Sequence, residues 1–92
     1  MQRWEPPHDP TETETRDVDF VERLAPGETL SSATWTPSPS GLSQVSATTS
    51  GSVATWKYSG GTGGLDYEIV CRALTTNGNT LEETIILRCR DR

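Results

Sequence analysis

Polar and apolar residues alternate in short runs along most of the chain, and turns rich in Gly and Pro separate these runs. Alternation over about four to eight residues is typical of a strand that buries one face. Short strands separated by regularly spaced turns are typical of β-sandwiches and barrels. The pattern therefore predicts an all-β sandwich of about seven strands. The runs that carry it are 16–20, 29–36, 42–48, 53–58, 65–75 and 81–90.

The register of the last hairpin can be predicted because one loop length gathers its apolar side chains. A two-residue loop would place Tyr67 and Ile69 on the same face as Glu82. A one-residue slip moves every side chain to the opposite face of the sheet. A three-residue loop over 76–78, closed by a G1 bulge at Gly78, is a known turn form. We expect that loop, because it groups the apolar residues of both strands, including Leu81, Ile85, Leu87 and Cys89.

This register also separates the two cysteines. Cys71 falls opposite Glu83, and Cys89 falls opposite Leu65. The two positions are then roughly 20 Å apart along the strands, at about 3.3 Å per residue. A disulfide needs Cα atoms within about 7 Å of each other. We therefore expect two thiols that are buried or half-buried and not linked to each other.

The first residues differ from the rest of the chain. The stretch 1–14 is polar and Pro-rich, and its prolines exclude a helix and favour extended backbone. We expect it to be an extended arm outside the core of the sandwich domain, which would span 15–92. Trp is a favoured anchor at protein interfaces, so Trp4 could dock on a partner, although packing on its own domain or disorder stays open. The expected partner-binding residues of the arm are Arg3, Trp4, Pro6, Pro7, His8 and Pro10.

Charge and hydropathy narrow the classes of partner. The net charge of −5 and the pI near 4.7 argue against a nucleic-acid-binding protein, which would carry a basic face. No apolar run approaches the length of a membrane span, and the N-terminus has no apolar signal-peptide region. We expect synthesis in the cytoplasm, with no nucleic-acid or membrane partner.

Candidate catalytic chemistry is sparse. His8 is the sole histidine, and it has no second ligand at a spacing that would favour a zinc site. The glycine-rich run 60–64 lacks the Lys-Ser/Thr ending and the helix of a phosphate-binding loop, so we expect a hairpin turn there. Asp17 and Asp19 share a strand face, where exposure to solvent is the simpler interpretation. We therefore expect no enzyme, no metal and no cofactor.

Three aromatic residues bear on the fold. Trp35 and Trp56 lie within expected strands, where core packing is the more common role. Tyr67 follows a Gly-Gly-Leu-Asp turn at the start of a strand. This position is similar to the tyrosine corner of Greek-key sandwiches, in which the hydroxyl bonds to upstream backbone. It favours an immunoglobulin-like or fibronectin III-like version of the sandwich.

Several motifs resemble those of a family of small tailed-bacteriophage virion structural proteins. The resemblance covers nearly all of residues 9–90. It rests on Asp9-Pro10, Asp17-Val18-Asp19-Phe20, Gly27-Glu28-Thr29-Leu30 followed by Ser32 and Trp35, Ser59-Gly60-Gly61-Thr62-Gly63-Gly64 followed by Tyr67, and Thr76-Asn77-Gly78. His8 replaces a usual Lys, and Phe20 a usual Trp. The resemblance implies an immunoglobulin-like sandwich located in a virion, at the head surface, neck or tail.

The family resemblance leaves three functional hypotheses. The first is a capsid decoration or cement protein that binds the major capsid protein or other virion proteins through its arm and sandwich. The second is a neck or tail accessory protein, associated with a connector or fibre. The third is a carbohydrate-binding or adhesion module, which would need an exposed aromatic platform. A homo-oligomer within the particle is compatible with the first two.

Overall fold

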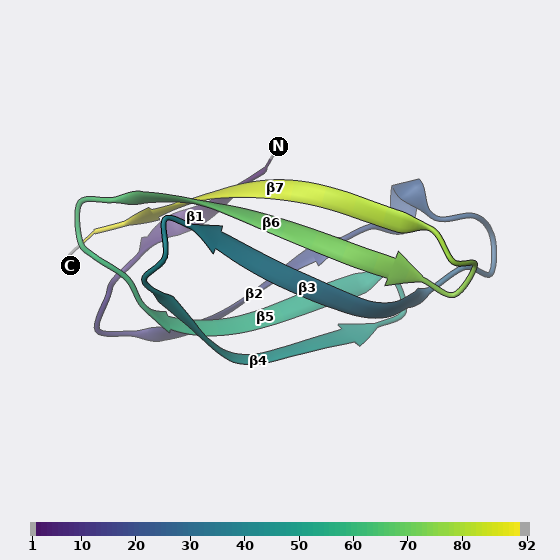
Figure 1. The fold of residues 1–92 in the computed structure, drawn as a ribbon, viewed down its shortest axis with the longest axis horizontal. Coiled ribbons are helices and arrows are strands. Elements are labelled where there is room, and N and C mark those ends of the chain that lie inside the picture. The colour runs from purple at the N-terminus through teal and green to yellow at the C-terminus, as the bar shows by residue number, and fades with distance from the viewer. Residues whose placement is uncertain (1, 91–92) are drawn as a thin grey trace.

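The computed structural model of this chain describes residues 2–90, apart from the side chains of Gln2, Glu5 and Pro6. Within that range the chain forms seven strands and one short 3-10 helix (Figure 1). All six predicted runs are strands, and the prediction of an all-β sandwich is confirmed. The elements are β1 (Gln2–His8), β2 (Thr13–Asp19), η1 (Val21–Arg23), β3 (Leu30–Ser38), β4 (Leu42–Ser50), β5 (Val53–Gly60), β6 (Asp66–Thr75) and β7 (Thr80–Cys89).

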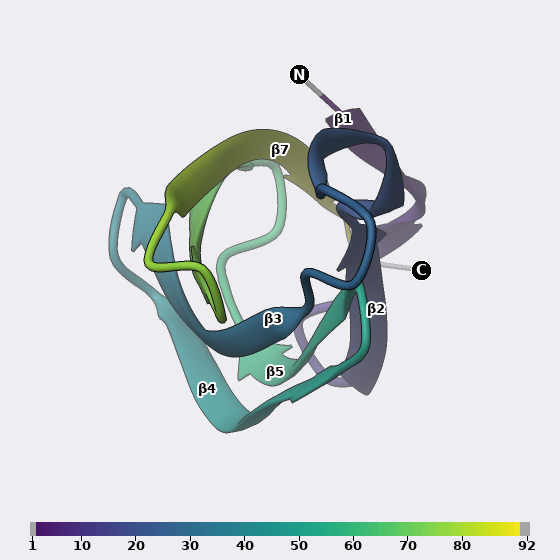
Figure 2. The same ribbon diagram turned by 90° about the vertical axis from the view of Figure 1, so that its right-hand side faces the viewer.

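The strands form two sheets that face each other across the core (Figure 2). The larger sheet has the order β1-β7-β6-β3, and the smaller has the order β2-β5-β4. All neighbours pair antiparallel except β1 and β7, which run parallel. This grouping of strands is compatible with an immunoglobulin-like Greek key. No helix in the described range is long and apolar enough to cross a membrane.

The core follows from the alternation along the strands. In β6 and β7 every second side chain is buried over most of each strand. The opposite sheet contributes aromatic residues from β5, which alternates in the same way. The largest fully buried side chains are Trp56, Tyr58, Tyr67, Phe20, Ile69, Ile85, Leu87, His8, Val18, Cys71 and Cys89.

The β6–β7 hairpin has the three-residue loop that the sequence predicts. Cys71 lies opposite Glu83, and Ile69 lies opposite Ile85. The Gly78 N–H donates to the Thr75 carbonyl over 3.0 Å, and Gly78 has a φ of 82°. The predicted register is therefore confirmed, because it alone brings the apolar side chains of both strands into the core.

The two cysteines are buried and are not joined in a disulfide, as predicted. Burial, with a smaller contribution from the nearby Glu83 carboxylate, raises the pKa of the Cys71 thiol to about 12. A thiol of this kind stays protonated at neutral pH and is a poor nucleophile. Its role is that of a small apolar group in the core.

The prediction of a hairpin turn over 60–64 is wrong. This run leaves β5 in the smaller sheet and enters β6 in the larger sheet, so it crosses between the sheets. Gly61 packs into the core, where a Cβ would lie 3.0 Å from Leu42 Cδ2 and 3.1 Å from Cys89 Sγ. The Tyr67 hydroxyl accepts a hydrogen bond from the Thr62 N–H over 2.9 Å. The predicted bond from this tyrosine to upstream backbone is therefore present.

The prediction that the N-terminal segment is an arm outside the core is also wrong for residues 2–8. β1 pairs with β7 at the edge of the larger sheet, and Trp4 and His8 are buried. Prolines are tolerated in β1 because an edge strand needs ladder hydrogen bonds on one side only. The pairing joins segments that are about 80 residues apart in the sequence, so a local pattern cannot identify the partner strand.

The crossing at Gly61 provides a test of this packing. Gly61 and Gly64 both have positive φ, at 97° and 92°, but a Cβ at Gly64 would meet nothing within 4 Å. Replacing either glycine with Ala should lower the free energy of unfolding by about 1–2 kcal/mol, because a residue with a Cβ is strained in the left-handed region. Gly61→Ala should lower the free energy of unfolding by roughly 1–3 kcal/mol more, because the added methyl group would overpack the core. Urea unfolding of both variants measures the difference, and equal losses would contradict the packing.

Candidate interaction surfaces

Trp4 is part of an aromatic cluster that packs between the two sheets and connects β1 to β5 and β3. Its ring stacks on Tyr58, with centroids 5.8 Å apart and planes 7° apart. Trp56 and Trp35 stack on each other at 5.5 Å and 6°. Trp56 also lies 4.9 Å from Tyr58, so the four rings form one continuous group. Aromatic pairs of this geometry add about 0.5–1.5 kcal/mol each beyond their burial.

His8 fixes the other end of β1 to the smaller sheet. Its ring lies edge-on to Tyr58 and is fully buried. Nε2 lies 2.9 Å from the Gly60 carbonyl, and Nδ1 lies 3.0 Å from Glu14 Oε1. Both ring nitrogens therefore face oxygen atoms that can accept a hydrogen bond. His8, which was predicted to bind a partner as part of the arm, therefore connects strands within the domain.

Glu14 is the centre of this polar network. Its Oε1 also accepts from the Tyr58 hydroxyl at 3.3 Å and from Arg16 Nη2 at 3.4 Å. Desolvation acts to raise the pKa of Glu14, but the hydrogen bond to His8 and the charge of Arg16 together lower it below its ordinary value. Burial raises the pKa of Tyr58. The network therefore holds a carboxylate between β1, β2 and β5.

Glu28 forms a second carboxylate clamp, at the opposite end of the sandwich. It accepts from the Thr75 hydroxyl over 2.6 Å, from the Ala25 N–H over 2.9 Å and from Asn79 Nδ2 over 3.0 Å. These bonds lower the pKa of Glu28. They connect the turn before β3 to the β6–β7 hairpin, so this acid is structural.

The residues predicted to bind a partner do not form one exposed site. Trp4 and His8 are buried, Pro7 and Pro10 are half-buried, and Arg3 is exposed. The side chain of Pro6 lies outside the described part of the structure. Contact with a partner through this segment stays a prediction. Among the predicted residues whose side chains are described, Arg3 is the exposed one.

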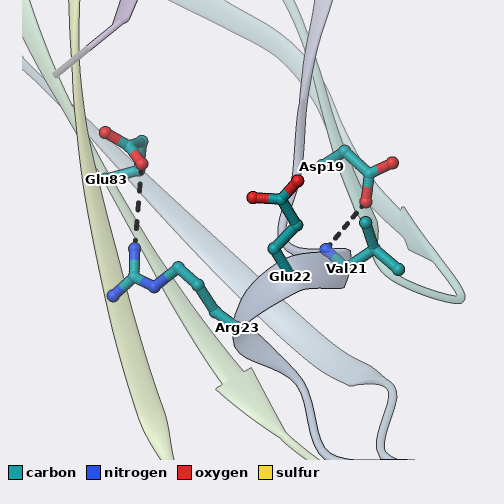
Figure 3. A pocket seen from close by; sticks show the side chains of 5 residues that line it. All are labelled: Asp19, Val21, Glu22, Arg23 and Glu83. Atoms are coloured by element: carbon teal, nitrogen blue, oxygen red, sulfur yellow. Dashed lines mark hydrogen bonds and ion pairs between the residues drawn. The ribbon is translucent and has the colours of Figure 1, made fainter.

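A hollow of about 390 Å³ lies beside η1 (Figure 3). Asp19 accepts from the Val21 N–H over 2.9 Å and from the Ser52 hydroxyl over 2.7 Å. Arg23 lies 3.7 Å from Glu83 and covers the Phe20 ring at 5.6 Å. Among residues 2–90 no three potential metal ligands gather in one place. The carboxylates here serve the turn and the packing of η1.

A second hollow, of about 330 Å³, lies on the outer face of the larger sheet. Thr34, Thr36, Val70 and Arg72 line it. Arg72 Nε donates to Glu82 on the neighbouring strand over 2.7 Å. The lining of this hollow therefore combines hydroxyl, methyl and guanidinium groups.

The side of the sandwich formed by β3 and β4 carries no charge. Between Glu28 and Lys57 the sequence contains no Asp, Glu, Lys or Arg, and both edge strands on this side lie in that span. β2, the opposite edge of the smaller sheet, holds Glu14, Arg16, Asp17 and Asp19. This asymmetry is visible in the sequence, but the topology is needed to show that the neutral strands are edges.

The buried position of Trp4 predicts that β1 is required for stability. Trp4→Ala should lower the free energy of unfolding by about 3–5 kcal/mol, the usual cost of removing a large aromatic side chain from a core. Arg3→Ala, at an exposed position of the same strand, should change it by about 0.5 kcal/mol or less. Chemical denaturation measures both. If Trp4→Ala were as stable as Arg3→Ala, the strand would not belong to the core.

The Glu14 network predicts a loss of stability in acid. A carboxyl whose folded pKa is lowered stabilises the fold above its unfolded pKa, near 4.5, and loses that contribution as pH falls through the folded pKa. Glu14→Gln should therefore be less stable than the native chain above pH 4.5, and the gap should close at lower pH. Urea unfolding across the acid range measures the gap, and a gap independent of pH would contradict the assignment.

The comparisons with known proteins place the chain among tailed-phage virion proteins. No curated protein matches it. A family model described as "Podophage GP4 fiber-tail adaptor protein gp77" matches residues 8–88. The match runs from the last residue of β1 almost to the end of β7, so it covers both sheets. The chain therefore belongs to the podophage GP4 fiber-tail adaptor family gp77 and is a structural component of a phage virion.

Proposed function

We propose that this protein is a tail component that connects a fibre to the phage tail. The family match across residues 8–88 is the observation that carries the proposal, because the family is described as a fiber-tail adaptor. That description favours the tail accessory hypothesis over capsid decoration, which has no support from the family. The partners would then be tail and fibre proteins, with no role for the major capsid protein.

The surface chemistry supports a binding role. The acids at Glu14 and Glu28 are engaged in fixing strands and turns, and the lone histidine is fully buried. The hollows beside η1 and on the larger sheet offer contacts of the kind proteins make with each other. An adaptor needs a rigid body with several separate surfaces, and it does not need a reactive group. We therefore propose that the protein is not an enzyme.

The carbohydrate-binding alternative loses its best residues. Trp35 and Trp56 are 6% and 1% exposed, and both stack inside the core. An aromatic platform for a sugar needs one open ring face. An adaptor role needs no such platform.

The proposal can be tested in particles made without this protein. Those particles should have full heads and tails but lack fibres, and adding the purified protein back with fibre protein should restore fibre attachment. Electron microscopy of the particles measures both. Fibres present at normal number, together with fragile heads, would contradict the tail assignment and favour capsid decoration.

A further inference from the structure

We propose that the free edge of β4 binds the same edge of a second copy of this chain. The two smaller sheets would then form one continuous sheet across a two-fold axis. Such self-association is separate from a fibre–tail connection and depends on the strand edges alone.

β4 is the edge of the smaller sheet that can accept another strand. The order β2-β5-β4 gives β4 a hydrogen-bonded neighbour on one side within residues 2–90. β4 is nine residues long and forms one border of the sandwich (Figure 1). A row of backbone N–H and C=O groups on a free edge is a template for pairing with another strand.

The four edge strands differ in the features that block such pairing. Natural sheets protect their edges with charged side chains and with proline. β1 contains Pro6 and Pro7, and β3 contains Pro37. β2 carries three acids and one base. β4, with the sequence LSQVSATTS, has neither a charge nor a proline.

A β-bulge limits where the second copy can pair. The register between β4 and β5 shifts between Gln44 and Ser46, with Val45 exposed by 54% at the shift. Gln44 is also occupied, because its Oε1 accepts from Trp56 Nε1 over 2.9 Å. The regular part of the edge is therefore 46–50, in which Ser46, Thr48 and Ser50 are exposed.

Self-pairing suits this stretch for an electrostatic reason. Across a two-fold axis an antiparallel strand meets its own residues, so a charged edge would set like charges against each other. A neutral edge avoids that repulsion. When the axis passes through Thr48, this residue faces its own copy and Ser46 faces Ser50 of the second chain. Thr–Thr and Ser–Ser neighbours of this kind can exchange hydroxyl hydrogen bonds.

The charged residues of the chain lie outside the paired edge, and Lys57 on β5, opposite Ser46, is the one that the register places next to it. The net charge is −5, but the span between Glu28 and Lys57 that contains β4 is neutral. The charged edge of the smaller sheet, β2, lies across β5 from the proposed contact. A contact through one short edge buries less than a standard interface, so the dimer should be weak in dilute solution and favoured where copies are held close together.

Cysteine cross-linking tests the geometry. Directly opposed residues of an antiparallel pair have Cα atoms about 4.5–5.5 Å apart, which a disulfide can bridge. Thr48→Cys should form a disulfide-linked dimer under mild oxidation at high protein concentration. Thr15→Cys, an exposed threonine on the opposite edge, is the matched control. We expect the Thr48→Cys dimer to form at least roughly tenfold faster, because pairing raises the effective concentration of the two thiols.

Sedimentation of the full chain without added cysteines gives a second readout. Thr48→Lys should shift the monomer–dimer equilibrium towards monomer, and Thr15→Lys should leave it unchanged. Equal cross-linking of the two cysteine variants would overturn the proposal, as would a dimer that tolerates Thr48→Lys. A third result would also overturn it: the native chain stays monomeric, and Thr48→Lys nevertheless blocks incorporation into virions. The edge would then bind another virion protein. None of these outcomes decides whether the chain joins fibre to tail.

Discussion

Four stacked aromatic rings hold the two sheets of this protein together, and one of them comes from the first strand. Trp4 lies on Tyr58, Tyr58 on Trp56, and Trp56 on Trp35. Without β1, the Tyr58 ring would lose one of its two stacking partners, and the fully buried His8 would leave Glu14. A domain of this size buries a modest fraction of its surface, so it depends strongly on each large aromatic contact.

The sequence predicts the local parts of this fold well and the long-range parts poorly. The β6–β7 register is predictable because one loop length alone gathers the apolar side chains. The placement of β1 is not, because it pairs in parallel with a strand at the far end of the chain and carries prolines that elsewhere indicate a linker. One signal was available: Trp4 and His8 are an even number of residues apart, as two inward positions of a strand would be.

The exposed surfaces of the sandwich are likewise only partly predictable from the sequence. The charge-free span is visible in the sequence, but only the strand order reveals that β4 is an edge. Trp4 and His8 are buried in the core, so strand edges and outer sheet faces make up most of the surface that the fold leaves exposed. A rigid sandwich whose edges differ in charge can present different surfaces to different neighbours, as the proposed adaptor role would require. The sequence motifs specified the fold family and not the position in the particle.

Amide hydrogen exchange tests the central claim, that the N-terminal strand is part of the core. The account predicts that the β1 amides paired with β7 exchange as slowly as those of β6 and β7, because they open only when the whole domain unfolds. Fast exchange in β1 beside a fully protected β6–β7 hairpin would contradict it, and would show that the segment detaches while the sandwich remains folded.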